Sequence, residues 1–245
     1  PQRLDALQGK ILRITPDLNL RPADELSANG RYRIPTTGAD PNPFVGLSLP
    51  NLKKEIFAYG FRNCHRISWD PIADVIVEND IGLNSWEEVN LIHKGANYGY
   101  GEREGAEQVF VCSSCPGTNG LTGSQISTGI PFPSPDLLTV TGLVSAVTPT
   151  YPVAQYSHRD GDGISSGFVY RGSLMPGLYG KYIFGDIANG RIFYADFNEM
   201  LAADDDNLNT VAATHELQVV YNNPLDTPDA GFARWRMFDI VAMTY

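Results

Sequence analysis

The sequence predicts an all-β protein, and three observations support this fold class. Many segments are short, rich in aromatic or β-branched residues, and bounded by Gly, Pro, Asn or Asp, as β-strands are. These segments follow one another at intervals of about ten residues. They do not alternate with helical segments, which favours antiparallel sheets over a βαβ architecture.

The expected strands cover 11–14, 55–60, 67–70, 74–79, 88–92, 108–111, 165–172, 180–186, 190–197, 215–221 and 234–241. A helix of one or two turns is expected only within 200–213, where a run of aspartates favours a solvated loop equally. Two long segments rich in Pro, Gly, Asn, Ser or Thr, 15–50 and 112–150, are expected to be loops.

Two parts of the chain resemble β-meanders. In 166–197, three expected strands are separated by turn residues at 176–177 and 188–190. The segment 55–92 shows a second series of strands of the same kind. Successive meanders favour a β-propeller over a sandwich, although no strict WD or kelch repeat is present. We therefore expect residues 1–245 to form a single propeller domain.

Composition excludes two classes of protein. The net charge of -10 argues against a nucleic-acid-binding protein, which needs a basic surface. No apolar run approaches the roughly 20 residues of a membrane-spanning helix. The chain begins with Pro1 instead of Met and ends within a strand-like stretch, so we expect it to be part of a longer chain.

Cys112 and Cys115 lie in a segment rich in Gly, Ser and Pro. A single C-x-x-C pair lacks the second pair of a zinc ribbon, and Pro116 stands where a haem attachment site has His. A local disulfide, two free thiols, and a redox or metal role all remain open. A disulfide would indicate an exported protein.

Several motifs in the chain resemble those of one family. They are GKILRI at 9–14, NPF at 42–44, EIFAYGFRN at 55–63, EEVNLI at 87–92, GANYGY at 95–100, GFVYRG at 167–172 and YIFGD at 182–186. In this order they resemble the glucose/sorbosone dehydrogenase family, whose members are sugar dehydrogenases that use pyrroloquinoline quinone (PQQ). They also resemble the related hedgehog-interacting-protein group, which shares the propeller without known redox chemistry.

The resemblance implies a six-bladed β-propeller, of which this chain would supply about four blades with long loops. The catalytic base of the family is a histidine upstream of the GKILRI motif. None of the four histidines of this chain matches it: His65, His93, His158 and His215. We therefore assign no catalytic residue within this segment.

By resemblance, Arg62 and Asn63 would bind the cofactor. A guanidinium suits a carboxylated quinone because it offers planar, charged hydrogen bonds, and an amide can orient an oxygen atom. The alternative is a turn asparagine beside a surface arginine. Later in the chain, Arg234 and Arg236 resemble a second cofactor-binding pair of arginines, and strand alternation places both on one face. Two solvent-facing arginines are the alternative there.

The resemblance also implies calcium. The main-chain carbonyls of Gly82 and Leu83 match a turn that holds Ca²⁺ beside PQQ, although Leu83 replaces the family's usual proline. Glu88 and the carbonyl of Tyr98 match a second calcium site. The alternatives are an ordinary turn at Gly82 and a turn-capping role for Glu88.

Two positions differ from the family and argue against PQQ. Ala188 replaces the family's quinone-binding lysine, and Gly161 lies near the place of an expected threonine. The motifs of serine hydrolases, zinc metalloproteases and P-loop proteins are absent from the sequence. Glu87 and Glu88 would point to opposite faces of an extended strand, which disfavours a glycosidase pair.

Two functions follow from the sequence. The first is calcium-assisted, PQQ-dependent oxidation of a small-molecule aldose sugar to its lactone. The second is a non-catalytic, calcium-binding propeller that acts as an extracellular binding or adhesion module. Both imply a secreted or periplasmic protein, and both are compatible with oligomers.

Overall fold

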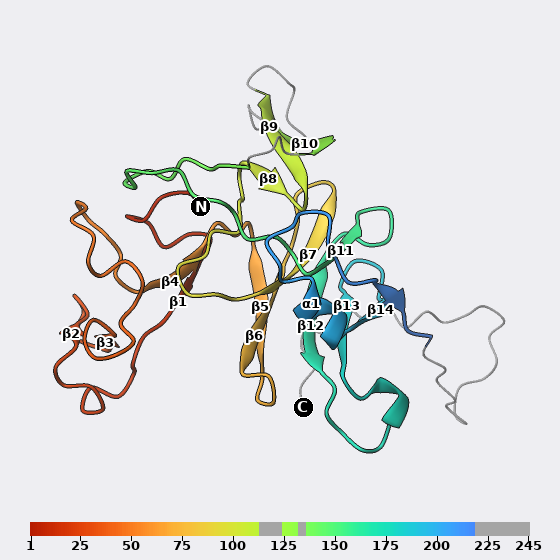
Figure 1. Ribbon diagram of the computed structural model, residues 1–245, viewed down its shortest axis with the longest axis horizontal. Helices are drawn as coiled ribbons and strands as arrows, with labels where there is room; N and C mark the ends of the chain where they lie inside the picture. The colour runs from red at the N-terminus through yellow and green to blue at the C-terminus, as the bar shows by residue number, and fades with distance from the viewer. Residues whose placement is uncertain (113–123, 132–135, 219–245) are drawn as a thin grey trace. The chain divides into compact units, whose positions relative to one another are not determined.

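The computed structural model describes residues 1–112, 124–131 and 136–218 of the chain (Figure 1). The chain divides into two compact units, Pro1–Cys64 with Ile92–Tyr151 and His65–Leu91 with Pro152–Tyr245. In the described residues nearly all regular structure is β-sheet, and the only helices are α1 (Phe197–Ala202) and a 3-10 turn, Pro176–Leu178. The predicted all-β class is therefore confirmed. None of the helices in the described residues is long and apolar enough to cross a membrane.

The first unit contains three small sheets. Antiparallel pairs join β1 (Lys10–Leu12) to β4 (Ile56–Tyr59) and β2 (Glu25–Leu26) to β3 (Arg33–Ile34). A three-stranded sheet has the order β10-β9-β8, with β8 at Arg103–Glu104, β9 at Glu107–Cys112 and β10 at Ser124–Pro131. The core of this unit is formed by Leu4, Phe44, Ile56, Tyr59 and Val140.

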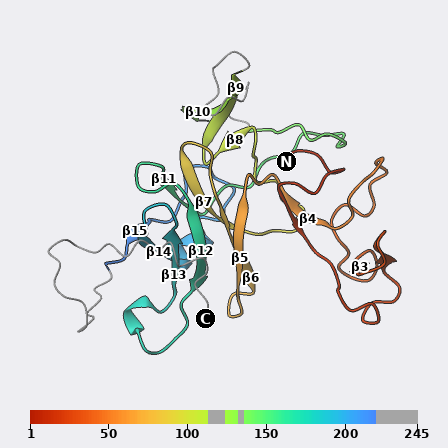
Figure 2. The ribbon, with the colours of Figure 1, turned by 180° about the vertical axis from the view of Figure 1, so that it is seen from behind.

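The second unit contains two four-stranded sheets. One has the order β11-β7-β6-β5, with β5 at Cys64–Asp70, β6 at Val75–Asp80, β7 at Trp86–Leu91 and β11 at Ala154–Ser157. The other has the order β12-β13-β14-β15, with β12 at Ile164–Val169, β13 at Lys181–Asp186, β14 at Ile192–Asp196 and β15 at His215–Glu216. Figure 2 shows β12, β13 and β14 side by side in chain order, as expected of a meander.

Strands β6, β7, β12 and β13 are buried along most of their length, and their apolar side chains pack between the sheets. Val77, Val89 and Leu91 are at most 1% exposed and share one apolar cluster with residues of the β12–β15 sheet. The cluster includes Phe184 and Phe193, whose rings are stacked 5.8 Å apart. Burial of such side chains is the main stabilising contribution to a packed pair of sheets.

The structure corrects the predicted meander over 55–92. β4 does not pair with β5; it pairs with β1, with Lys10 opposite Tyr59. The fourth strand beside β5, β6 and β7 is β11, which pairs with β7 through Gln155 opposite Glu88. Local sequence signals identify strands, but the choice of partner is made by contacts between residues far apart in the chain.

Three smaller expectations also needed correction. The connection between β12 and β13 is not a tight turn, because it includes the 3-10 turn at Pro176–Leu178. The helix α1 begins at Phe197 and ends at Ala202, so it begins before the expected segment 200–213 and overlaps it only at 200–202. Strands β2 and β3 lie within the expected loop 15–50, and β10 lies within the expected loop 112–150. The expected strand 234–241 lies outside the described residues.

Candidate functional site

The Arg62–Asn63 pair lies in the connection between β4 and β5, within the first unit. Arg62 is half-buried and Asn63 is exposed. The turn before them is closely packed: Gly60 has φ +87°, and a Cβ atom there would lie 2.3 Å from Asn97 Oδ1. Only glycine fits this position, so the approach of this turn to Asn97 is built into the backbone.

The same close approach places Tyr98 beside the Arg62 loop. Residues 59 and 97 form a β-bridge, and the Tyr98 ring stacks on Phe61 with centroids 4.5 Å apart. The Tyr98 side chain is 2% exposed, and its hydroxyl accepts a hydrogen bond from the backbone amide of His93 at 2.9 Å. The side chain of Tyr98 therefore has a packing role, which leaves its main-chain carbonyl as the group that could hold a cation.

Gly82, Leu83 and Glu88 lie together on the hairpin of β6 and β7 in the second unit. Gly82 and Leu83 are in the turn, whereas Glu88 is the third residue of β7 and not at a strand end as the sequence suggested. Its register partner on β6 is Asp80. Glu88 is 6% exposed and Asp80 is 4% exposed, so the two acidic residues are paired across a buried part of the sheet.

A second pair of polar residues continues this face of the hairpin. Glu78 lies opposite Asn90 in the register, and both are fully buried. The Asn90 amide donates to Glu78 Oε2 at 3.1 Å and to Glu88 Oε2 at 3.4 Å. We call Glu78, Asp80, Glu88 and Asn90 the acidic hairpin.

The chemistry of this hairpin fits calcium, which prefers carboxylate and carbonyl oxygens. The carbonyls of Gly82 and Leu83 lie in the turn of the same hairpin. Across the part of the chain that the structure describes, no three His, Cys, Asp or Glu side chains are arranged as a metal site. A calcium ion here would therefore need main-chain carbonyls among its ligands. The sequence analysis assigned the carbonyls of Gly82 and Leu83 to one calcium site and Glu88, with the carbonyl of Tyr98, to a second, and both assignments stay predictions.

Glu87 points to the opposite face from Glu88, as strand alternation predicted. Its Oε2 accepts a hydrogen bond from the Ile164 amide at 2.8 Å, and its Oε1 lies 2.7 Å from His158 Nε2. Asp162 Oδ1 lies 3.6 Å from His158 Nδ1. The sequence analysis did not detect the Glu87–His158 pair. Glu87 lies on β7 and His158 directly follows β11, so the two residues meet only when β11 pairs with β7.

The segment 158–163 (HRDGDG) forms a turn with ion pairs. Asp160 contacts Arg191 through both its carbonyl, at 2.6 Å, and its carboxylate, at 3.4 Å. Asp162 faces His158, as described above. Both aspartates of this segment therefore have polar partners within the protein.

The two positions that differ from the family lie close together on the second unit. Ala188 is in the turn between β13 and β14, where its backbone amide donates to Asp186 Oδ1 at 2.9 Å. A Cβ atom on Gly161 would lie 2.2 Å from Asp186 Oδ2. Asp186 is fully buried and its carboxylate also accepts from Tyr156 and from the Gly163 amide. A threonine at position 161 is therefore excluded by the carboxylate that organises this turn.

Other assigned residues lie outside the described part of the chain. These are Arg234 and Arg236, the second cofactor-binding pair, and Cys115, so neither that pair nor a Cys112–Cys115 bond has a structural description. Cys112 is the last residue of β9.

Comparison with known proteins confirms the class of protein that these motifs indicated. Residues 1–109 match the model of the glucose/sorbosone dehydrogenase family. Among solved structures, the soluble aldose sugar dehydrogenase of Escherichia coli in its apo form has a TM-score of 0.52 and 21% sequence identity. That match covers 87% of this chain and 45% of the other. The fold is therefore that of part of a sugar-dehydrogenase β-propeller, as predicted.

Two individual proteins of known sequence are similar to this chain. The HIPL1 protein of Arabidopsis thaliana is 32% identical over 196 residues, which are 76% of this chain and 24% of that protein. The aldose sugar dehydrogenase YliI of Escherichia coli is 32% identical over 99 residues, 40% of this chain and 21% of the relative. The matched parts of this chain thus span about a quarter of HIPL1 and about a fifth of YliI. This chain therefore resembles both the sugar dehydrogenases and the HIPL1 protein.

Proposed function

We propose that this chain is part of a single propeller domain that oxidises aldose sugars to lactones with PQQ and Ca²⁺. The observation that supports this most directly is the acidic hairpin. Its buried pair of carboxylates, Asp80 and Glu88, adjoins a turn at the two positions where the family resemblance implies calcium-binding carbonyls. Burying two acidic residues side by side is costly unless a cation or other donors compensate their charge.

In this proposal each residue has a distinct task. Gly82 and Leu83 would offer main-chain carbonyls to one calcium ion, and Glu88 and the carbonyl of Tyr98 are the ligands that the resemblance implies for a second. Calcium beside the cofactor would supply positive charge for a quinone oxygen. Arg62 binds a carboxylate or oxygen of the cofactor through its charged guanidinium.

Asn63, which is exposed, orients an oxygen of the quinone or of the sugar. Arg234 and Arg236 are proposed as a second anchor for the cofactor. When bound, PQQ supplies the hydride acceptor. The proton of the sugar C1 hydroxyl is taken by the family's upstream histidine, which does not correspond to any of the four histidines here.

A calcium titration tests the metal part of this proposal. Terbium(III) is a luminescent substitute for calcium, and Trp86 lies two residues before Glu88 on β7, so bound terbium is expected to be sensitised by tryptophan excitation. Glu88→Gln keeps the shape of the side chain and should weaken binding by about tenfold or more, because one charged ligand is lost. The matched control is Glu216→Gln on β15, an exposed carboxylate outside the hairpin. Equal binding by wild type and Glu88→Gln would exclude this calcium site.

Dye reduction by the protein with PQQ, calcium and an aldose tests the catalytic part. The expected result is turnover that requires both cofactors and falls sharply in Arg62→Met. Because the catalytic histidine is assigned to a region upstream, the longest natural form of the protein is the correct sample. Absence of both turnover and PQQ absorbance would refute the enzymatic proposal.

A second function is favoured by Ala188 and Gly161. Ala188 removes the positive charge that the family places near the quinone, and the packing of Gly161 against Asp186 prevents a threonine hydroxyl there. A non-catalytic, calcium-binding module fits these two changes and the similarity to HIPL1. It predicts calcium binding that is sensitive to Glu88→Gln, together with no PQQ binding. Both functions place the protein in the periplasm or outside the cell.

A further inference from the structure

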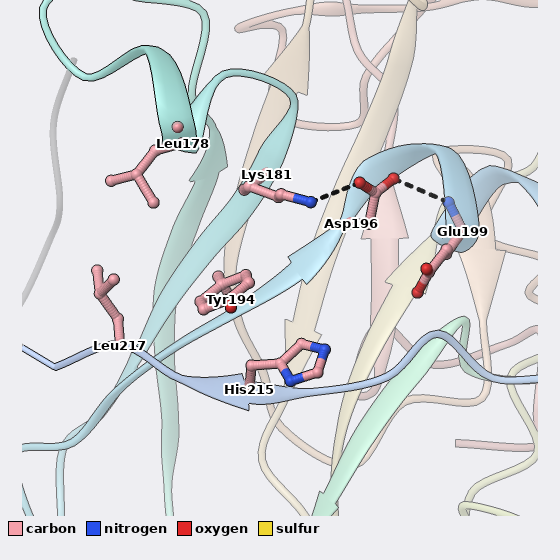
Figure 3. A pocket seen from close by; sticks show the side chains of 8 residues that line it. Leu178, Lys181, Tyr194, Asp196, Glu199, His215 and Leu217 are labelled. Carbon is pink, nitrogen blue, oxygen red and sulfur yellow. Dashed lines mark hydrogen bonds and ion pairs between the residues drawn. The ribbon is translucent and has the colours of Figure 1, made fainter.

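A small hollow of about 230 Å³ lies on the β12–β15 sheet of the second unit and shares no residue with the acidic hairpin (Figure 3). Its floor is formed by Tyr194 on β14 and His215 on β15, which are direct register partners. Their rings are stacked with centroids 5.1 Å apart and an interplanar angle of 28°. The sheet thus presents a preformed aromatic surface next to open space.

Two charged side chains, Lys181 and Asp196, lie beside this aromatic surface, and hydrogen bonds fix their positions. Lys181 Nζ lies 2.6 Å from Asp196 Oδ2, and these residues are also register partners, on β13 and β14. The other Asp196 oxygen accepts from the backbone amides of Asn198 and Glu199, so the carboxylate caps the start of α1. Figure 3 shows the bond from Lys181 and the bond from the Glu199 amide. Because both side chains are fixed by the fold, they need little reorganisation to bind a ligand.

Lys181 and Asp196 stabilise each other's charged forms. The hydrogen bond from Lys181 is the main reason that the pKa of Asp196 lies below its usual value. The reciprocal bond raises the pKa of Lys181 above its usual value. Both groups therefore remain charged at neutral pH, and the Lys181 ammonium has further N–H protons besides the one given to Asp196.

The combination of groups selects a class of ligand. Lys181 donates, Asp196 and the exposed Glu199 accept, and the outer face of the stacked Tyr194–His215 pair offers a flat apolar surface. A ligand that matches all three has hydroxyl groups around its edge and C–H bonds on one face, whose weakly positive hydrogens fit the negative face of an aromatic ring. Two acidic groups, Asp196 and Glu199, outweigh one lysine in the lining, which disfavours an anion.

We propose that this hollow is a binding site for a neutral pyranose sugar, separate from the proposed oxidation site. The sugar ring lies on Tyr194 and His215, and its hydroxyl groups bond to Lys181, Asp196 and Glu199. The same chemistry is offered by a free monosaccharide and by one residue of a glycan chain. The hollow has room for a single sugar ring, and its polar lining fixes the ring's orientation.

Methyl β-D-glucopyranoside is the decisive probe, because its C1 oxygen is blocked and the sugar cannot be oxidised to a lactone. Binding is measured without PQQ or calcium by saturation-transfer NMR and by calorimetry, so failure here and failure of the proposed function are distinguishable. We expect millimolar binding that Tyr194→Ala and His215→Ala each weaken about tenfold. The matched control is Trp69→Ala, which removes an exposed aromatic side chain from the other sheet of the same unit. Circular dichroism and thermal midpoints verify that each variant is folded.

Two further probes test the ligand class. Methyl β-D-glucuronide, which is anionic, should bind more weakly than the glucoside, and Glu199→Gln should narrow that difference. Cellotetraose distinguishes the sources: tighter binding than the glucoside indicates a residue within a glycan, and equal binding indicates a free sugar. Either of these results supports the site. Absent saturation transfer, equal effects of Tyr194→Ala and Trp69→Ala, or tighter binding of the glucuronide would each overturn the proposal.

Discussion

Gly161 shows how one residue constrains the β13–β14 turn. The Asp186 carboxylate binds the amides of Gly163, Ala188 and Asn189 and the hydroxyl of Tyr156. It can do so only because residue 161 has no side chain. The same carboxylate and burial raise the pKa of Tyr156 well above its usual value, with burial the larger cause, so this hydroxyl remains a donor.

Gly161→Ala should destabilise the protein by about 1–3 kcal/mol, because the added methyl group overlaps Asp186 Oδ2 in a packed region. The free energy of unfolding in urea is the appropriate measurement. Gly177→Ala is the control, since no atom lies within 4 Å of a Cβ there. Equal stability of the two variants would show that Asp186 has freedom to move.

A second residue-scale prediction concerns Asp70. Arg171 binds both oxygens of this carboxylate at 2.9 Å, and the Ala73 amide adds a third bond. Burial by itself opposes ionisation of Asp70, but these hydrogen bonds outweigh it and lower its pKa below the usual value. A carboxyl whose pKa is lowered on folding stabilises the protein above its unfolded pKa, near 3.8, and this contribution is lost as pH falls through the folded pKa.

Arg171→Met should therefore cost about 3 kcal/mol at pH 7, because it leaves a buried carboxylate without its partner. The cost should shrink as the pH falls below about 4, where Asp70 becomes protonated. Urea unfolding at several pH values measures both effects. The exposed Arg3–Asp5 pair provides the control: Asp5→Asn should change stability far less than Arg171→Met, because solvent screens an exposed ion pair. A cost for Arg171→Met that does not depend on pH would contradict the assignment to Asp70.

At the scale of elements, a buried polar chain joins the two sheets of the second unit. The Tyr182 hydroxyl donates to Asn79 Oδ1 at 2.8 Å, and the Asn79 amide donates to the Ser165 carbonyl. Asn79 and Ser165 are fully buried and Tyr182 is 1% exposed. Because each group sits among apolar side chains, these bonds specify which strands face each other.

Tyr182→Phe should cost about 1–2 kcal/mol, because the substitution preserves the ring but removes the donor to a buried amide oxygen. Tyr179→Phe, at a residue that is 53% exposed, should cost much less. Chemical denaturation of both variants gives the comparison. If Tyr182→Phe were neutral, another donor would have to satisfy Asn79.

At the scale of the whole molecule, calcium binding should be visible as added stability. A ligand that binds only the folded state raises the free energy of unfolding by about 2.7 kcal/mol at a concentration of 100 times its Kd. Thermal unfolding should therefore shift upward with calcium and return on addition of EDTA. A tenfold weaker site in Glu88→Gln should reduce the stabilisation by about half at the same calcium concentration. An undiminished shift in Glu88→Gln would place any bound calcium elsewhere.

Much of the fold was predictable from local signals. Gly and Pro boundaries and apolar alternation identified the strands from β4 to β7 and from β12 to β14, and the motifs at 55–63 and 87–100 identified the family. What local signals missed was strand partnership: β4 pairs with β1, and β11 joins β7. Pairing is decided by long-range packing, which no short window of sequence contains.

The candidate sites likewise combine features that the sequence predicts with features that depend on the tertiary structure. The sequence by itself determined the donor types of the proposed calcium and cofactor sites, because carboxylate, carbonyl and guanidinium chemistry belongs to the residue wherever it lies. Only the tertiary structure decided that Glu88 faces Asp80, that Glu87 meets His158 and that Tyr194 stacks on His215. Each of these pairs depends on the register between strands, and a shift of one residue would turn every side chain to the other face.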